Sequence, residues 1–195
     1  MKVVFIRAAR SKGYIRVGIS DGEEKCDLTV SEADYRDAGS PLSGDTLETD
    51  TISLLKNSDM RYRAGLYALR ILSFADNNEK TLYRKLLSRG IRADIAEDVS
   101  HDMVSRGYID EKRQLSIIIT EEVNRKLTGP HKLRPKLIAK GYSAADINSE
   151  ISRLLRSGEI DFERSSALLI EKKLPSDHTE EEVKKLLYKN GYDIC

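Results

Sequence analysis

The sequence predicts a mainly α-helical protein, built as tandem three-helix repeats in an elongated, curved body with a small β-rich N-terminal extension. Three observations predict this class. A basic helical phrase ending in glycine occurs three times at intervals near 50 residues, and β-branched residues gather in the first thirty positions. Charged residues make up 33% of the chain and hydrophobic residues 39%, which suffices for small cores but not for one thick core.

The first fifty residues form the β-rich part and contain the start of an acidic segment. The β-branched runs at 3–6 and 14–20 predict two strands, and the Asp-Gly pair at 21–22 predicts a turn before a weaker strand at 25–30. Ser-x-x-Asp at 31–34 predicts a short helix. Residues 21–59 contain 11 acidic and 3 basic side chains, so charge is segregated along the chain.

The repeated phrase occupies residues 80–91, 131–142 and 181–192, and each copy predicts a helix with one buried face. Each copy ends at a glycine where a left-handed C-terminal cap is expected, at Gly90, Gly141 and Gly191. Before these glycines we align three apolar pairs: Leu86–Leu87, Leu137–Ile138 and Leu186–Leu187. Pro135 interrupts the second copy, so its helix either starts near Arg134 or is kinked.

A second repeated motif follows the first two copies and predicts one more helix in each repeat. Gly107 and Gly158 are each followed by Ile-Asp-x-x-Arg, which places Asp110 and Asp161 as N-caps of the next helix. The isoleucine before each aspartate can act as a hydrophobic staple. We therefore divide the chain into a β-rich extension with an acidic segment, two three-helix repeats and a truncated third repeat, at residues 1–50, 51–111, 112–161 and 162–195.

Signals for catalysis, metal binding or membrane insertion are weak. Residues 13–20 have the glycine spacing of a phosphate-binding loop but lack its lysine. The acidic run Glu180–Glu182 suits the positive N-terminal end of a helix better than a catalytic site. Cys195 has no partner residue that would make it a nucleophile. No signal peptide or run of about 20 apolar residues is present. We expect a cytoplasmic monomer that is not an enzyme and has no cofactor or metal. Metal-ligand spacing is absent among the three histidines, His101, His131 and His178.

Basic side chains on the repeated helices are the candidates for partner binding. Residues 123–145 contain six basic side chains and no acidic one, although the net charge of the chain is only +1. Lysine or arginine pairs four residues apart recur in the three copies, and such pairs share a helix face. Contact of this face with phosphate would be sensitive to salt and largely independent of sequence. The candidates are Arg84, Lys85, Arg89, Arg125, Lys126, Lys132, Arg134, Lys136, Lys140, Lys184, Lys185 and Lys189. Three tyrosines could stack on bases, although packing is the commoner role: Tyr83, Tyr142 and Tyr188.

The stretch ALRILSFADNNEKTLYRKLLSRGI with the later GYIDEKR resembles the RecX family of bacterial regulatory proteins, as does GPHKLRPKLIAKGY. The likeness runs from Tyr67 to the C-terminus, and the β-rich start is similar to the extension of some family members. It implies three tandem three-helix units, and a role in DNA repair, homologous recombination and the SOS response. The implied partner is the RecA recombinase filament on single-stranded DNA, whose ATPase, strand-exchange and co-protease activities family members usually inhibit.

The sequence departs from the family pattern in three places. Gln114 and Leu115 stand where the family has an aromatic residue and alanine, Pro135 interrupts a helix, and the chain ends at residues 191–195 where a last helix should begin. Val183, Leu186 and Leu187 are therefore expected to be partly uncovered. The alternative function is a direct nucleic-acid-binding protein of helix-turn-helix-like repeats whose partner is the DNA duplex itself. The recombinase regulator could also contact single- or double-stranded DNA. Few amide side chains lie on the repeated helices, which favours the recombinase regulator.

Overall fold

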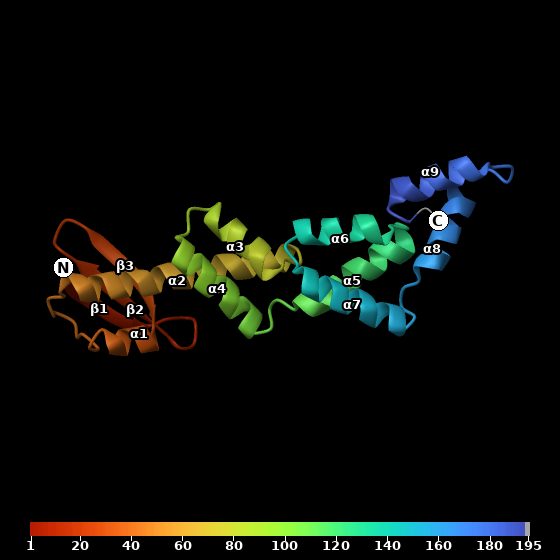
Figure 1. The fold of residues 1–195 in the computed structure, drawn as a ribbon. Coiled ribbons are helices and arrows are strands. Elements are labelled where there is room, and N and C mark those ends of the chain that lie inside the picture. Colours follow the sequence, from red (N-terminus) through yellow and green to blue (C-terminus); the bar gives the residue numbers. More distant parts are fainter. Residues whose placement is uncertain (194–195) are drawn as a thin grey trace. The chain divides into compact units, whose positions relative to one another are not determined.

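The computed structural model describes residues 1–193 and is mainly helical, with a three-stranded sheet near the N-terminus (Figure 1). This confirms the predicted mainly α-helical class with a small β-rich N-terminal part, and the tandem three-helix repeats stay a prediction. The chain forms two compact units, Met1–Ala75 with Leu82–Met103, and Asp76–Thr81 with the chain from Val104 onward. The elements in order are β1 (Lys2–Ala8), β2 (Tyr14–Ser20), β3 (Lys25–Ser31), α1 (Glu32–Asp37), α2 (Thr49–Phe74), α3 (Glu79–Leu87), α4 (Ala93–Ser105), α5 (Glu111–Thr120), the π-helix η1 (Glu121–Arg125), α6 (Pro130–Ala139), α7 (Ala144–Arg156), α8 (Phe162–Lys173) and α9 (Glu180–Asn190).

The sheet is antiparallel in the order β1-β2-β3, as the turn signals between the strands predict. Alternate residues of β2 face the core, where Val17 and Ile19 are buried. They pack with Leu28 and Val30 of β3 and with Leu55 of α2. The first half of α2 therefore belongs to the core of the sheet.

Both edges of the sheet are covered, which protects it from pairing with other chains. Along β3, the amide of Thr29 donates to Asp59 Oδ1 at 2.8 Å and the amide of Ser31 donates to Ser58 Oγ at 3.0 Å. Ser58 and Asp59 are buried polar residues of α2. Along β1, the amide of Val3 donates to the carbonyl of Asp45 at 2.9 Å. Helix α2 thus closes one edge and the loop before it closes the other.

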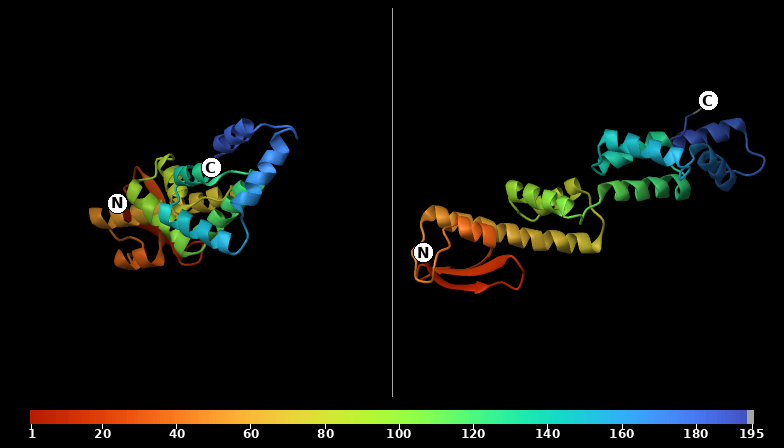
Figure 2. Two further views of the ribbon diagram at one scale, coloured as in Figure 1. Left: turned by 45° about the vertical axis from the view of Figure 1, so that its right-hand side comes forward. Right: turned by 90° about the horizontal axis from the view of Figure 1, so that it is seen from below.

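The second half of α2 lies beside α3 and α4 (Figures 1 and 2). The side chains that α2 buries in its second half are small, namely those of Ala64 and Ala68. The shorter helices α3 and α4 supply larger side chains. Their buried apolar residues are Leu82, Leu86, Ile95, Ala96, Val99 and Met103.

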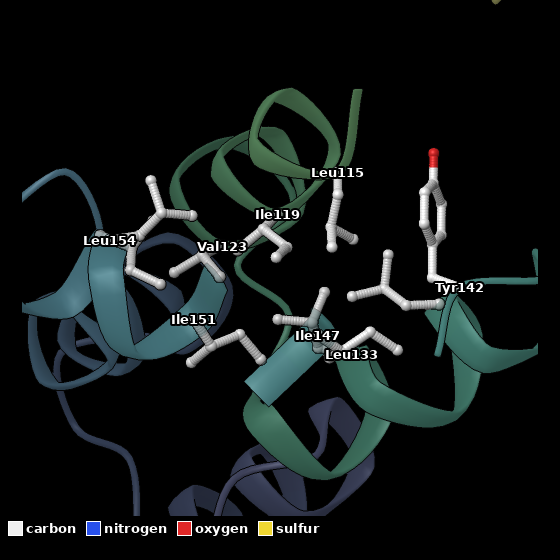
Figure 3. Close-up of a cluster of buried hydrophobic side chains, with 10 residues drawn as sticks. Leu115, Ile119, Val123, Leu133, Tyr142, Ile147, Ile151 and Leu154 are labelled. Carbon is white, nitrogen blue, oxygen red and sulfur yellow. The ribbon is translucent and has the colours of Figure 1, made fainter. Parts of the chain in front are cut away.

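In the second unit α5, η1, α6 and α7 enclose one apolar cluster (Figure 3). Each helix turns one stripe inward, as its spacing of apolar residues predicts. The cluster consists of Leu115, Ile119, Val123, Leu133, Leu137, Tyr142, Ile147, Ile151, Leu154 and Ile160. A smaller cluster of Leu127, Leu169 and Tyr192 joins α8 and α9 to this unit. The four-part division of the chain and its curved overall shape stay predictions.

The helix ends predicted from glycine and aspartate are confirmed. Gly90, Gly141 and Gly191 have φ angles of 78°, 105° and 84°, the left-handed conformation that glycine adopts without strain. The Asp110 side chain accepts from the amide of Arg113, and Asp161 caps α8 in the same way. These ends depend on short-range hydrogen bonds, so the local sequence suffices to predict them.

Helix α6 begins at Pro130, so the first of the two alternatives, a start near Arg134, is wrong, and the kink stays a prediction. Pro130 fits the first turn because the amide that proline lacks has no partner within a helix at that position. Pro135 lies inside the helix and on its exposed side. There it removes the one amide that would donate to the carbonyl of His131.

Candidate partner-binding surface

Helices α3, α6 and α9, the middle helices of the three predicted repeats, are linked by the same kind of junction. The amides of Gly129 and His131, at the start of α6, donate to the carbonyls of Asn190 and Gly191, at the end of α9, at 2.8 and 3.0 Å. A Cβ atom on Gly129 would lie 2.3 Å from the carbonyl of Gly191, so glycine is needed for this approach. Backbone amides at the start of α6 and carbonyls at the end of α9, which have no partner within their own helices, are thus hydrogen-bonded to each other.

The other end of α6 repeats this arrangement. At the start of α3, Asn78 Nδ2 donates to the carbonyl of Lys140 at 2.8 Å, and Asn78 Oδ1 accepts from the amide of Thr81 at 2.8 Å. In both junctions the last carbonyls of one middle helix meet donors at the start of the preceding one.

All the predicted basic candidates are exposed, from Arg84 in α3 to Lys189 in α9. Exposure is a requirement for partner binding, and their binding role stays a prediction. The contacts of these side chains within the protein differ, and they divide the candidates into separate groups.

Lys126 and Lys136 hold a buried carboxylate. Glu122 of η1 is 2% exposed, and it accepts hydrogen bonds from Lys136 Nζ at 2.7 Å, Lys126 Nζ at 2.9 Å and Thr128 Oγ1 at 3.2 Å. Burial raises the pKa of Glu122, but hydrogen bonds from Lys136 and Lys126 outweigh it, and the pKa lies below its ordinary value. Lys136 therefore joins α6 to η1, and Lys126 binds the same carboxylate from the C-terminal end of η1.

Other candidates have weaker contacts. Arg125, Lys184 and Lys185 pair with glutamates one helical turn earlier, at 3.7, 3.4 and 2.7 Å. Exposed pairs of this kind contribute little to stability and can be given up to a partner. The Arg89 guanidinium lies 5.2 Å from the centre of the Tyr67 ring, and Arg134 Nε donates to Asn148 Oδ1 at 3.1 Å. Among the described residues, Lys132, Lys140 and Lys189 make no ion pair.

The alignment of the third copy shifts by one residue in the structure. Each residue after the cap glycine donates its amide to an equivalent leucine carbonyl, from Ile91 to Leu86, from Tyr142 to Leu137 and from Tyr192 to Leu187. The equivalent of Leu86 and Leu137 is therefore Leu187, not Leu186 as the sequence alignment had it. One residue is about 100° of helix rotation, so Lys185 and Lys189 face differently from Lys136 and Lys140. The basic pair thus recurs in all three copies, but in the third copy it lies one residue earlier relative to the cap glycine.

With the register corrected, a different feature recurs in all three middle helices. An apolar side chain three residues before the cap glycine is exposed in each, with exposed fractions of 37% for Leu87, 52% for Ile138 and 72% for Tyr188. A basic residue lies three or four positions earlier, and side chains at that spacing share a helix face. We call these groups the apolar–basic sites: Leu87 with Arg84, Ile138 with Arg134, and Tyr188 with Lys184 and Lys185.

Sequence reasoning named Tyr188 as a stacking candidate but missed Leu87 and Ile138, because it assigned the apolar pair before each glycine to the buried face. A signal was present, since the residue after the buried Leu86 or Leu137 is turned about 100° away from it. A similar pair occurs in the preceding helices, where Leu66 of α2 and Ile117 of α5 are exposed and 51 residues apart.

The tyrosines expected to stack or pack have different surroundings. Tyr142 is buried in the cluster of Figure 3, with its hydroxyl 3.5 Å from Gln114 Oε1. Burial, with the nearby charges of Glu111 and Asp76, raises the pKa of Tyr142 to about 12. Tyr83 is half-buried and Tyr188 is exposed. Tyr188 is therefore the tyrosine of the three that a partner can reach most fully.

The residues weighed for catalysis have ordinary structural surroundings. Residues 14–20 form strand β2, and Glu182 closes a capping box with Thr179 at the start of α9. His131 Nε2 lies 2.6 Å from Asp193 Oδ1, and His178 Nδ1 lies 2.7 Å from the carbonyl of Pro175. Cys195 lies outside the described residues.

Residues 1–193 contain no cluster of three or more histidine, cysteine, aspartate or glutamate side chains arranged to hold a metal ion. None of the helices in this part of the chain, including the long α2, combines the length and apolar character needed to cross a bilayer.

Comparison with known proteins gives one consistent result. The chain is 27% identical over 146 residues to the regulatory protein RecX of Clostridioides difficile and 21% identical over 180 residues to that of Oceanobacillus iheyensis. These alignments cover 75% and 89% of this chain but only 66% and 64% of those relatives. A shorter alignment of 78 residues, with 32% identity, joins 40% of this chain to 49% of the RecX of Chlorobium limicola. No protein-family model matches the chain.

Solved structures show the same fold. A crystal structure of a regulatory protein RecX superposes with a TM-score of 0.75 at 20% identity, over 98% of this chain and 94% of the other. The RecX of Lactobacillus salivarius superposes with a TM-score of 0.57 at 18% identity, over 69% of this chain and 90% of the other. These likenesses confirm the resemblance that the repeated phrases indicate.

Proposed function

We propose that this chain, which has the fold and the sequence features of the RecX family, regulates the RecA recombinase by binding its filament on single-stranded DNA. The observation that carries this proposal is the recurrence of one apolar–basic site in each middle helix. A filament of identical subunits offers the same acceptor site many times, so a chain that repeats a small binding group matches it.

The chemistry of these groups suits a protein partner. An exposed aliphatic or aromatic side chain can fill a pocket on the partner, and a neighbouring arginine or lysine can meet a carboxylate at its rim. Each group alone is small and would bind weakly. Several such groups on one chain strengthen each other through effective concentration. Inhibition of ATP hydrolysis and strand exchange follows when the bound chain hinders movement between neighbouring RecA subunits.

An ATPase titration tests this function. We expect the chain to reduce ATP hydrolysis by RecA on single-stranded DNA at ratios well below one to one. Ile138→Ser should weaken this inhibition about tenfold, which corresponds to about 1.4 kcal/mol. Leu155→Ser is the matched control, because Leu155 is 44% exposed but lies on α7, outside the middle helices. No inhibition at any ratio, together with tight binding to duplex DNA, would favour the helix-turn-helix-like alternative.

Charge reversal tests the basic part of the surface. The set Lys132→Glu, Arg134→Glu and Lys140→Glu should weaken filament binding and leave the fold intact. Lys136 is not substituted, because its loss would leave the buried Glu122 carboxylate without this lysine partner and destabilise the fold. A loss of binding could then not be distinguished from unfolding. Undiminished filament binding by the triple variant at moderate salt would show that these side chains do not contact the partner.

A further inference from the structure

The outer face of the N-terminal sheet carries a strong local charge. Residues 1–20 contain five basic side chains and no acidic one, whereas the whole chain has a net charge of only +1. These five are exposed on the β1–β2 hairpin: Lys2, Arg7, Arg10, Lys12 and Arg16. Arg16 pairs with Asp27, whereas within the described residues Lys2, Arg7, Arg10 and Lys12 make no ion pair, so the charge of these four is not neutralised by an ion pair.

Two of these side chains are directly opposed. Arg7 of β1 and Arg16 of β2 are cross-strand partners in the register of the sheet. Like charges at directly opposite positions destabilise a sheet. Arg16 is bonded to Asp27 of β3, with Nε 3.2 Å from Oδ1. Arg7 has no carboxylate partner among the described residues, and an added anion would relieve the repulsion between the two arginines.

An aromatic ring lies on the same face. Val17 and Ile19 point into the core, so their neighbours Arg16 and Gly18 point outward. Phe5 is paired with Gly18, and a Cβ atom on Gly18 would lie 2.2 Å from the Phe5 ring. The ring therefore lies across the glycine, and the Arg7 guanidinium sits 5.0 Å from its centre. The sheet thus presents an aromatic ring beside unpaired arginine.

We propose that this face, formed by Phe5, Arg7 and Arg16 with Arg10 and Lys12 at the hairpin turn, binds single-stranded nucleic acid. Single strands offer both partners that the face requires, phosphates for the basic side chains and unpaired bases for stacking against the ring and the Arg7 guanidinium. Bases held inside a duplex offer no free face to the ring, and an acidic peptide offers no base. The site lies in the first compact unit and does not depend on the proposed regulation of RecA.

Fluorescence anisotropy of a labelled oligothymidine of about 20 nucleotides, mixed with the full chain in the absence of RecA, tests the proposal. The triple variant Arg7→Gln, Arg10→Gln and Lys12→Gln should bind about tenfold more weakly and reduce the slope of log affinity against log salt by about 2. Arg164→Gln, Lys172→Gln and Lys173→Gln form the matched control, because this set removes the same charge from exposed residues of α8. Equal losses in both triples, or no loss in either, would overturn the proposal.

The aromatic contribution has its own test. Phe5→Leu keeps an apolar side chain over Gly18, and it should weaken oligothymidine binding severalfold without changing the salt slope. Circular dichroism melting checks that the sheet is intact. Duplex DNA or polyglutamate bound as tightly as oligothymidine would overturn the assignment to single strands. Ile138→Ser should bind oligothymidine normally, so failure of the RecA assay and failure of this one are distinguishable.

Discussion

Helices α6 and α9 share one sequence phrase but differ in burial. Leu133 and Leu137 of α6 are fully buried between α5, η1 and α7, whereas α9 contains no fully buried residue. Val183, Leu186 and Leu187 are half-buried, as the sequence predicts. The local sequence of each copy determines that a helix forms and that it ends at the glycine. The neighbouring helices determine how many of its apolar side chains are buried.

This difference predicts a gradient of local stability. Helices with few buried apolar contacts open more readily than those in a packed cluster, because less apolar surface must be returned to water. Helix α9 should therefore exchange its amide hydrogens faster than α6. Matched substitutions in the packed cluster around α6 and in α9 therefore should differ in their effect on stability.

Leu137→Ala should lower the free energy of unfolding by about 3 kcal/mol, because it leaves a cavity in the cluster around α6. Leu187→Ala, at the equivalent position of α9, should cost only about 1 kcal/mol, since this side chain is half exposed before the change. Urea unfolding followed by circular dichroism measures both. Equal losses would contradict the difference in burial between the two helices.

Glu122→Gln should lower the free energy of unfolding at neutral pH by about 2 kcal/mol, because Lys126 and Lys136 lose their charged acceptor. The pKa of Glu122 is lowered on folding, so the carboxylate contributes stability above its ordinary pKa of 4.5. That contribution is lost as the pH falls through the lowered pKa. The difference between wild type and variant should therefore shrink on acidification.

The matched control is Glu181→Gln in α9, whose partner Lys185 is also exposed. Its effect should stay below about 0.5 kcal/mol at neutral pH. Urea unfolding at a series of pH values measures both variants. A Glu122→Gln effect that does not change from neutral to acid would show that the carboxylate charge is not what holds η1 to α6.

Thr179→Ala should destabilise α9 by about 1 kcal/mol, because it removes the capping box with Glu182. The effect should be confined to α9, which has little core to transmit it. Hydrogen exchange should show faster exchange of the α9 amides and unchanged protection of α6. Protection lost in both helices would mean that their junction couples them more tightly than the hydrogen bonds of Gly129 and His131 indicate.

Features of the fold that depend on residues close in the sequence could be predicted. The strands, the helix caps at Asp110 and Asp161 and the left-handed glycines all follow from bonds that close within a few residues. Features that depend on distant residues could not. Lys136 looked like a surface lysine because its partner Glu122 is 14 residues away and on another helix. The closure of the β3 edge by Ser58 and Asp59 spans about thirty residues and leaves no local pattern.

The candidate site divides in the same way. The amino-acid pattern alone predicts three glycine-capped basic helices whose basic side chains remain outside, since buried lysine and arginine are costly. The register of the third copy also follows from the local sequence, because its cap glycine stands four residues after Leu187, as the first two cap glycines stand four residues after Leu86 and Leu137. How far each apolar side chain of these helices is covered was settled by tertiary packing, because the exposure of Ile138 and Tyr188 depends on which distant segments of the chain pack beside them.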